Sequence, residues 1–577
     1  MLAARYADVD NKKFNGATYT PEILADFVAK QILNVFEFPK KGVVRVLDPA
    51  CGDGALLDAL IRNIPKPVRK RLIIVGFDTD PTAVELATQN LRDSFPDLNF
   101  HVEQKDFLKY VLNLQDADIF SVEEPLVPFD LVIANPPYVR TQVLGATQAQ
   151  KLAESFDLKG RIDLYYPFIL GISVVLDEKG SVGVITSNRF MTTKGGQSIR
   201  REMLKRFEIL SIWDLGDTKI FDAAVLPSVF IAKGSSCKSL TKVEDISFST
   251  IYETKDKPTA KSSDVLTVLK EASGTVTEVP DGKNFRVLHG ILANGDNPEG
   301  VWRISTKNTD EWLDTVAKNT WDTFRRIGKI RVGVKSTADK VFLRSDWDTL
   351  PSGRPELLKP LITRKCANRF KAVIPENPKH RKEILYPHEM TENGRSAINL
   401  DLYPKSATYL EEHKEALSSR KYLIEAGRNW YELWVPQNPA AWSLPKLVFP
   451  DISEKPVFWI DMDGGVVNGE CYWLQPSRDN EKDLMWLALA VGNSSFIETF
   501  YDCCFNNKLY AGKRRFITQY VELFPLPNPY TSSAIEIINL TKEIYAKTPS
   551  EEAGDLYLEL DNRIWEIFGL NGKKVAG

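Results

Sequence analysis

The sequence predicts an α/β protein with a doubly wound sheet between about residues 41 and 240 and a separate mixed α+β domain after it. Three observations predict this. Short apolar runs rich in β-branched residues alternate with amphipathic stretches. Most of these runs are apolar throughout, as expected of strands covered on both faces. After about residue 320, tryptophan, proline and basic residues interleave irregularly and the alternation does not return.

Seven apolar runs are expected to be the strands of the sheet: Val43–Leu47, Leu72–Phe77, Asn99–Glu103, Leu131–Ala134, Val182–Thr186, Ile209–Asp214 and Val229–Ala232. The amphipathic stretches between them are expected to be helices, for example Ala55–Arg62, Ala83–Arg92 and Gln197–Phe207. Open α/β sheets bind ligands at the carboxyl ends of their strands. The residues that directly follow each strand are therefore the expected binding site.

The pattern divides the chain into five parts. Residues 1–40 form an N-terminal segment and a helix that packs on the sheet domain, which covers 41–240. A polar stretch rich in Ser, Thr and Lys opens a connecting region, 241–320, and the second domain follows at 321–530. Residues 531–577 are expected to form C-terminal helices, with these packing residues: Leu556, Leu558, Leu560, Ile564, Trp565 and Phe568.

Charge is distributed unevenly along the 577 residues, whose net charge is −3. Residues 321–390 contain sixteen Lys and Arg against eight Asp and Glu, so the rest of the chain is acidic. A basic segment in an acidic chain suits a polyanion-binding surface confined to one domain. A solvated charged face accounts for the same composition equally well.

Several classes of protein are disfavoured. The sequence has no run of about twenty apolar residues, so no membrane span is expected. The N-terminus carries acids and lacks an apolar core, so it does not resemble a secretion signal. The six cysteines form no CxxC pair, and the five histidines form no HExxH or HxE pattern. We therefore expect a cytoplasmic protein with free thiols and no metal.

A glycine-rich turn follows the first strand, in the segment Asp48-Pro49-Ala50-Cys51-Gly52-Asp53-Gly54. Gly52 and Gly54 allow the backbone to approach a ligand closely. Leu57 occupies the position where a dinucleotide fingerprint has its third glycine, so a dinucleotide site is not favoured.

Acidic residues also close the next two strands. Asp78 follows the second strand and can accept hydrogen bonds from both hydroxyls of a ribose. Asp106 and Phe107 follow the third strand and offer an acceptor and an apolar face that suit an adenine ring. Each acid alone could be a helix cap. With Asp48 at the first strand, acids stand at three successive strand ends, and this favours a nucleoside site.

The fourth strand ends in Asn135-Pro136-Pro137-Tyr138. An amine attached to an aromatic ring is a poor nucleophile because its lone pair is delocalised. The Asn135 side-chain oxygen and the Pro136 carbonyl can accept its two N–H hydrogens and favour a more tetrahedral nitrogen, while Tyr138 offers a face for ring stacking. Pro137 stiffens the turn. The alternative is a simple turn with a packed tyrosine.

These segments, in this order, resemble the gamma class of amino methyltransferases, which includes the Taq-type adenine-N6 DNA methyltransferases. The resemblance implies a Rossmann-like, seven-stranded methyltransferase domain that uses S-adenosylmethionine and no metal. It makes residues 135–138 the catalytic motif and 48–54 the methyl-donor loop, with Asp48, Ala50, Gly52 and Gly54. It also implies that Thr20, in Gly16-Ala17-Thr18-Tyr19-Thr20-Pro21, contacts the donor carboxylate. In the same way Asp78 would bind the ribose, and Asp106, Phe107 and Phe168 would surround the adenine.

Further segments extend the resemblance. Lys219-Ile220-Phe221-Asp222 resembles the motif whose aromatic residue contacts the target base, which gives Phe221 that role. Parts of the second half are similar to the target-recognition domain of this class, and these are residues 332–336, 357–362, 428–433, 445–448 and 513–527. Length and layout also resemble the Bse-type modification methylases.

The resemblance implies a methyltransferase of a restriction-modification system that methylates adenine N6 in double-stranded DNA after base flipping. It also implies a monomer whose cognate restriction endonuclease acts on the same site without stable association. A protein-glutamine (release factor) methyltransferase and a ribosomal-RNA base methyltransferase share the tetrapeptide and stay open as alternatives, as do N4-cytosine methylation and a silent DNA-binding subunit.

Overall fold

The computed structural model describes residues 20–116, 127–138, 146–160, 162–220, 226–235, 243–478, 481–505, 509, 512–550 and 553–570. The chain forms two compact units. Unit 1 comprises Met1–Lys307 with Cys504–Gly512 and Gly577, and unit 2 comprises Asn308–Cys503 and Lys513–Ala576. Within these described ranges, no helix has both the length and the apolar character needed to cross a membrane.

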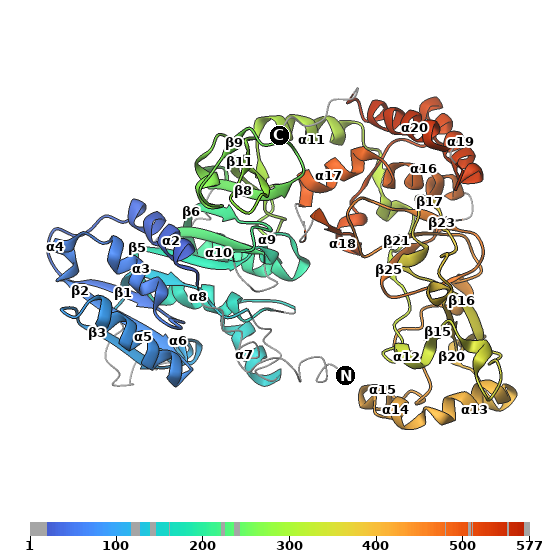
Figure 1. Cartoon of the computed structure of the whole chain (residues 1–577), viewed down its shortest axis with the longest axis horizontal. Helices are drawn as coiled ribbons and strands as arrows, with labels where there is room; N and C mark the ends of the chain where they lie inside the picture. Colours follow the sequence, from blue (N-terminus) through green and yellow to red (C-terminus); the bar gives the residue numbers. More distant parts are fainter. Residues whose placement is uncertain are drawn as a thin grey trace. The chain divides into compact units, whose positions relative to one another are not determined.

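All seven predicted strands are present in unit 1, and the predicted α/β fold is confirmed (Figure 1). They are β1 (Val44–Asp48), β2 (Leu72–Asp78), β3 (Phe100–Gln104), β4 (Phe129–Ala134), β5 (Leu176–Ser187), β6 (Phe207–Asp214) and β7 (Pro227–Gly234). Their order in the sheet is β3-β2-β1-β4-β5-β7-β6. Strand β7 runs antiparallel to both of its neighbours, whereas the other pairings among these strands are parallel.

The sheet continues beyond β6 into the segment predicted to be a connecting region. The added strands are β8 (Ser247–Thr254), β9 (Ala260–Lys261), β10 (Val276–Glu278), β11 (Asn284–Ala293) and β12 (Arg303–Ser305). Counted over the described residues, the sheet then has twelve strands. Most of these additions are short or polar on one face, so they lack the continuous apolar run that marks a strand covered on both sides. The five-part domain division itself stays a prediction.

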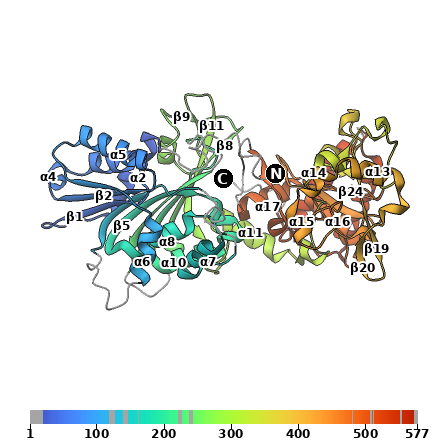
Figure 2. The ribbon, with the colours of Figure 1, turned by 90° about the horizontal axis from the view of Figure 1, so that it is seen from below.

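Helices cover both faces of the sheet (Figure 2). On one face lie α2 (Glu22–Val35), α3 (Ala55–Asn63) and α5 (Pro81–Ser94), whose apolar residues share one core cluster. On the other face lie α6 (Phe107–Asp116), α7 (Ala146–Ser155), α8 (Tyr165–Val175) and α10 (Gln197–Arg206), which share a second cluster. The sheet is therefore doubly wound. Because helices cover both faces, a ligand can reach the sheet only at the ends of its strands.

Unit 2 is a mixed α+β structure, as predicted. One sheet has the order β14-β25-β21-β23-β17 and contains Arg331–Val332, Cys471–Leu474, Lys446–Pro450, Trp459–Asp461 and Phe370–Lys371. A smaller sheet has the order β15-β18-β16-β24 and contains Leu343–Arg344, Glu383–Leu385, Leu358–Ile362 and Val466–Val467. The longer helices are α11 (Lys307–Lys318), α13 (Pro404–Glu412), α16 (Lys482–Gly492), α17 (Ser495–Phe505), α19 (Ser532–Lys547) and α20 (Ala553–Ile567).

Aromatic side chains and one ion pair form much of the unit 2 core. The tryptophans with at most 1% exposure in this unit are Trp347, Trp442, Trp459 and Trp473. Lys446 Nζ lies 2.6 Å from Asp461 Oδ2, and both side chains are buried.

One predicted packing residue of the C-terminal helices is wrong. Leu558 is 68% exposed, whereas Leu560, Ile564 and Trp565 of α20 are buried. Leu560 and Ile564 are four residues apart and share a helix face, while Leu558 is two residues from Leu560 and points to nearly the opposite side.

Candidate active site

The glycine turn between β1 and α3 is tied to the end of β2. Cys51 N donates to Phe77 O at 2.8 Å, and Gly52 N donates to Asp78 Oδ2 at 2.9 Å. Gly52 and Gly54 have φ values of +53° and +85°, a region that residues with a side chain rarely adopt. A Cβ atom added at Gly52 would meet nothing within 4 Å, so the turn faces open space there.

Asp48 is fully buried at the base of this turn. Its Oδ1 accepts a hydrogen bond from Ala50 N at 3.0 Å, whereas Oδ2 is buried with no partner among the described residues. Burial raises the pKa of Asp48 to about 8. A buried carboxyl oxygen left unpaired is costly, so this atom suits a hydrogen-bonding partner supplied by a ligand.

The two acids that follow β2 and β3 both make local hydrogen bonds. Asp78 Oδ1 accepts from Asp80 N at 2.9 Å, in addition to the bond from Gly52 to Oδ2. Asp106 Oδ1 accepts from Leu108 N and Lys109 N at 3.1 and 3.2 Å and so caps α6. A carboxylate has about four lone-pair sites, so each acid keeps capacity for a ligand.

The two aromatic residues assigned to an adenine pocket pack on each other. The ring centroids of Phe107 and Phe168 are 5.2 Å apart, and their exposures are 1% and 7%. Both belong to the core cluster beneath α6 and α8. Their role toward adenine stays a prediction.

The catalytic tetrapeptide follows β4 at the same edge of the sheet. Val46 and Leu47 of β1 pair in parallel with Leu131 and Val132 of β4, so the glycine turn and Asn135 extend from the same ends of neighbouring strands. Carboxyl ends of adjacent parallel strands form the usual binding edge of such a sheet.

Two hydrogen bonds hold the Asn135 side chain. Its Nδ2 donates to Thr20 Oγ1 at 3.0 Å, and its Oδ1 accepts from the Tyr138 hydroxyl at 2.6 Å. The Tyr138 ring lies edge-on to Tyr165 with centroids 6.2 Å apart. Burial raises the pKa of Tyr138, so its phenol remains a donor. The structure thus joins Thr20, Asn135 and Tyr138.

Some predicted residues lie outside the described residues. These are Phe221 and the part of the N-terminal motif that precedes Thr20.

A buried polar cluster at the same edge was not predicted. Asn188 follows β5, Asp214 ends β6 and Tyr252 lies on β8. Asp214 accepts from Asn188 Nδ2 at 3.0 Å, from the Tyr252 hydroxyl at 2.7 Å and from Gly216 N at 3.1 Å. These bonds anchor the turn that leads toward residue 221. The position of Asp214 at a strand end was the signal that could have found it.

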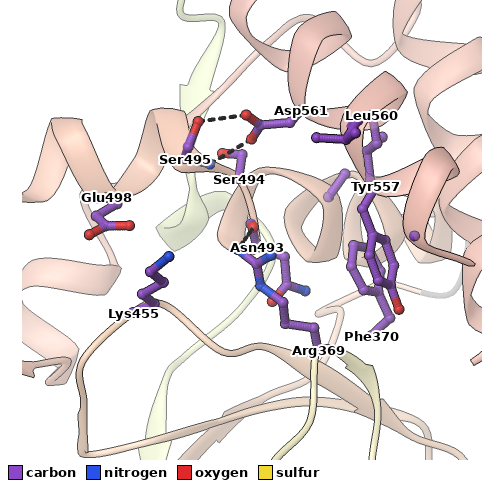
Figure 3. A pocket seen from close by; sticks show the side chains of 13 residues that line it. Arg369, Phe370, Lys455, Asn493, Ser494, Ser495, Glu498, Tyr557, Leu560 and Asp561 are labelled. Carbon is purple, nitrogen blue, oxygen red and sulfur yellow. Dashed lines mark hydrogen bonds between the residues drawn. The ribbon is translucent and has the colours of Figure 1, made fainter. Parts of the chain in front are cut away.

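Unit 2 has a cavity of about 340 Å³ (Figure 3). Its polar groups largely bond one another: Asp561 accepts from Ser495 N and Oγ at 2.6 Å, and Arg369 donates to Asn493 O at 2.6 Å. Phe370 and Tyr557 stack with centroids 5.1 Å apart. None of the residues predicted to act in catalysis or donor binding lines it. Nowhere in the described ranges is a group of three or more His, Cys, Asp or Glu placed to hold a metal ion.

The fold and the site define a class of protein. Four features are those of an S-adenosylmethionine-dependent methyltransferase. They are the reversed strand β7 between β5 and β6, the glycine turn after β1, the acid after β2 and the Asn-Pro-Pro-Tyr segment after β4. The positive-φ glycines, the open space at Gly52 and the buried oxygen of Asp48 that has no partner among the described residues fit this donor.

Comparisons with known proteins identify the family. The Eco57I restriction-modification methylase model matches residues 73–221. The type II methyltransferase M.BanIII of Aneurinibacillus aneurinilyticus is 38% identical over 575 residues, 97% of each chain. M.BstVI of Geobacillus stearothermophilus is 24% identical over 98% of this chain and 97% of its own. The chain belongs to the type II restriction-modification methyltransferases, which confirms the predicted resemblance.

A solved structure supports the fold of the whole chain. The DrdV–DNA complex has a TM-score of 0.53 at 12% identity, covering 96% of this chain and 61% of that one. The similarity to M.BanIII extends over both halves of the chain. The protein is therefore an S-adenosylmethionine-dependent DNA methyltransferase.

Proposed function

We propose that this methyltransferase acts on the N6 amino group of adenine in a short double-stranded target, after the base has been rotated out of the helix. The observation that carries the proposal is the Asn135 amide, held by Thr20 and Tyr138 beside the glycine turn. Chemistry on a base amino group requires the base to leave the stack, because its nitrogen is otherwise inaccessible.

The residues of the tetrapeptide supply the two acceptors that the amine needs. Asn135 Oδ1 takes one N–H hydrogen once the amine replaces the Tyr138 hydroxyl. The Pro136 carbonyl takes the other, and it receives no hydrogen bond from any residue that the structure describes. The donor supplies a methyl group on a positively charged sulfur. No strong base is needed, since the proton leaves only as positive charge develops on the nitrogen.

The remaining predicted residues have holding roles in this proposal. Asp48, Ala50, Gly52 and Gly54 form the floor of the donor site, and Asp78 binds its ribose. Asp106, Phe107 and Phe168 flank its adenine. Tyr138 and Phe221 enclose the target ring, with base–aromatic stacking that contributes about 1–3 kcal/mol per base.

Unit 2 is proposed to recognise the target sequence. Its segment 321–390 is strongly basic, although several of its arginines form ion pairs, for example Arg326 with Glu481 at 2.7 Å and Arg354 with Glu383 at 2.8 Å. Unpaired lysines and arginines would contact phosphates, while polar side chains read base edges.

Product analysis tests the function directly. The protein is incubated with labelled S-adenosylmethionine and plasmid DNA, and with ribosomal RNA and a release factor as controls. Digestion of the DNA to nucleosides should give N6-methyladenine. N4-methylcytosine as the sole product would overturn the proposed chemistry, while label confined to RNA or protein would overturn the substrate.

We also propose that the protein acts as a monomer and shares its recognition site with a separate endonuclease. Sedimentation of the protein should give the mass of one chain. Plasmid carrying the active gene should resist the one endonuclease that reads the same site, and plasmid carrying Asn135→Ala should be cut. A stable dimer, or protection by the inactive variant, would contradict this.

A further inference from the structure

We infer that Thr20 is a positioning residue that sets the orientation of the Asn135 amide, so that the oxygen faces the target amine. This inference rests on the proposed function, because it concerns how the same catalytic amide is held. It assigns to Thr20 a task separate from any contact with the methyl donor.

An asparagine amide can act in either of two orientations. Its oxygen accepts hydrogen bonds and its nitrogen donates them, yet the two ends have nearly the same size. An amine that presents N–H hydrogens needs the oxygen, and the reversed amide would oppose donor to donor. The side chain therefore requires a neighbour that accepts from its nitrogen.

Thr20 is that neighbour in this structure. Its Oγ1 lies 3.0 Å from Asn135 Nδ2, across 115 residues of sequence. On the other side, the Tyr138 hydroxyl lies 2.6 Å from Asn135 Oδ1. If the target amine takes the place of the Tyr138 hydroxyl at Oδ1, as proposed above, the bond to Thr20 is the one that still fixes the amide.

The position of Thr20 is set by the core and not by the site. It directly precedes Pro21, whose carbonyl accepts from Leu24 N and Ala25 N at 3.0 Å at the start of α2. The buried face of α2 consists of Leu24, Ala25, Val28, Ala29 and Ile32.

Helix α2 also packs tightly on the sheet beside the catalytic strand. A Cβ atom added at Gly183 of β5 would lie 2.6 Å from the Ile32 side chain. Gly183 pairs with Ile133 of β4, two residues before Asn135. One rigid framework therefore carries both Thr20 and Asn135, which is what orienting an amide requires.

The test compares Thr20→Val with Thr20→Ser. Valine keeps the shape of threonine and removes its hydroxyl, while serine keeps the hydroxyl. Single-turnover methylation is measured on cognate duplex at saturating S-adenosylmethionine, and donor affinity is measured separately by calorimetry. Thr20→Val should slow the methyl-transfer step about tenfold, the effect of one lost hydrogen bond that leaves a donor unpaired. Thr20→Ser should keep most of the wild-type methyl-transfer rate.

A double-mutant cycle with Asn135→Ala separates positioning from other roles. If Thr20 acts through the amide, Thr20→Val should have no further effect on the residual rate of Asn135→Ala. A slowing of equal size in both backgrounds, or an unchanged rate for Thr20→Val in the wild-type background, would overturn the inference. The melting temperature of each variant verifies that it is folded.

The outcome is distinguishable from a failure of the proposed function. The wild-type product alone decides whether adenine N6 is the target. The cycle measures the coupling between Thr20 and Asn135 with whichever nucleoside product is found, so a failed cycle with N6-methyladenine present refutes only the role of Thr20.

Discussion

Unit 1 and unit 2 differ in how their strands bring distant residues together. In unit 1, residues from separate sequence motifs meet at one sheet edge, because parallel strands all end there. In unit 2, strands of two to five residues pair across long stretches of chain, as in β14 with β25 and β16 with β24. Its core depends on buried tryptophans and on the Lys446–Asp461 pair.

The difference concerns what each unit needs from its sequence. Methyl transfer needs a few groups at fixed strand ends, and short local motifs provide them. The target recognition proposed for unit 2 needs a surface, and the surface follows from how irregular segments fold together. Variants of the strand-end groups in unit 1 should therefore mainly lose turnover, whereas variants of the core of unit 2 should lose stability.

The largest effect is expected in unit 1 for Asn135→Ala. Loss of the acceptor for the target amine should lower turnover about a thousandfold, as for other preorganised polar groups at a reaction centre. Donor affinity and melting temperature should stay near those of the wild type. Calorimetry with S-adenosylmethionine measures the donor affinity, and steady-state methylation measures the turnover. Turnover at the wild-type level would refute the catalytic assignment.

In unit 2, Lys446→Ala should lower the free energy of unfolding by about 3 kcal/mol, since it leaves the buried Asp461 carboxylate unpaired. Chemical denaturation measures this. The double variant Lys446→Met with Asp461→Leu should recover most of the loss, because both charges are removed. If the single and the double variant lost the same free energy of unfolding, packing and not charge would be responsible.

Stability should also depend on pH through Asp48 of unit 1. Its pKa in the folded protein is about 8, against an ordinary value of 3.8, because the carboxyl is buried. The folded state therefore binds more protons than the unfolded state between these values, and the free energy of unfolding should fall as pH rises. The slope from this group approaches about 1.4 kcal/mol per pH unit. Asp48→Asn should remove that contribution in urea titrations at pH 5, 6 and 7.

A smaller effect is expected for the ribose contact. Asp78→Ala should weaken S-adenosylmethionine binding about tenfold, as for loss of a charged hydrogen-bond acceptor. Asp80→Ala is the matched control: Asp80 caps α5 by accepting from Thr82 N at 2.9 Å and has no assigned contact with the donor. Equal losses of affinity in the two variants would assign Asp78 a structural role only.

The smallest effect is expected for Tyr138→Phe. The ring that stacks on the base remains, and the hydroxyl that competes for Asn135 Oδ1 is gone. Insertion of the target base should become easier by about twofold to fivefold, within the net worth of one hydrogen bond. Fluorescence of 2-aminopurine at the target position reports this. Tyr138→Ala should instead weaken insertion, since stacking is lost.

Much of the fold of unit 1 could be predicted, for identifiable reasons. Runs such as Leu72–Phe77 are apolar throughout, which is the pattern expected of a strand covered on both sides. The reversal of β7 was not predicted from the apolar runs, because a buried strand can be apolar throughout in either direction. The continuation of the sheet through β8 to β12 was missed because those strands lack continuous apolar runs.

The predicted site shows the same division. Gly52, Asp78 and Asn135 could be singled out because strand ends and turn residues are visible locally, and their roles stay predictions. The cluster of Asn188, Asp214 and Tyr252 was missed, since its members are hydrogen-bonded across 26 to 64 residues. The contact of Thr20 with Asn135 was not predicted either, although each residue had been singled out.

The sequence by itself determined the family, the strands of the catalytic sheet and the identity of the groups available for chemistry, because these depend on short patterns of polarity and turn residues. Only the tertiary structure decided which of those groups touch. It showed that Thr20 and Tyr138 both hold the Asn135 amide, that Gly52 bonds Asp78, and that one buried oxygen of Asp48 has no partner in the part of the chain that the structure describes. Contacts of this kind depend on the packing of α2 and on strand order, which are set by interactions between residues far apart in the chain.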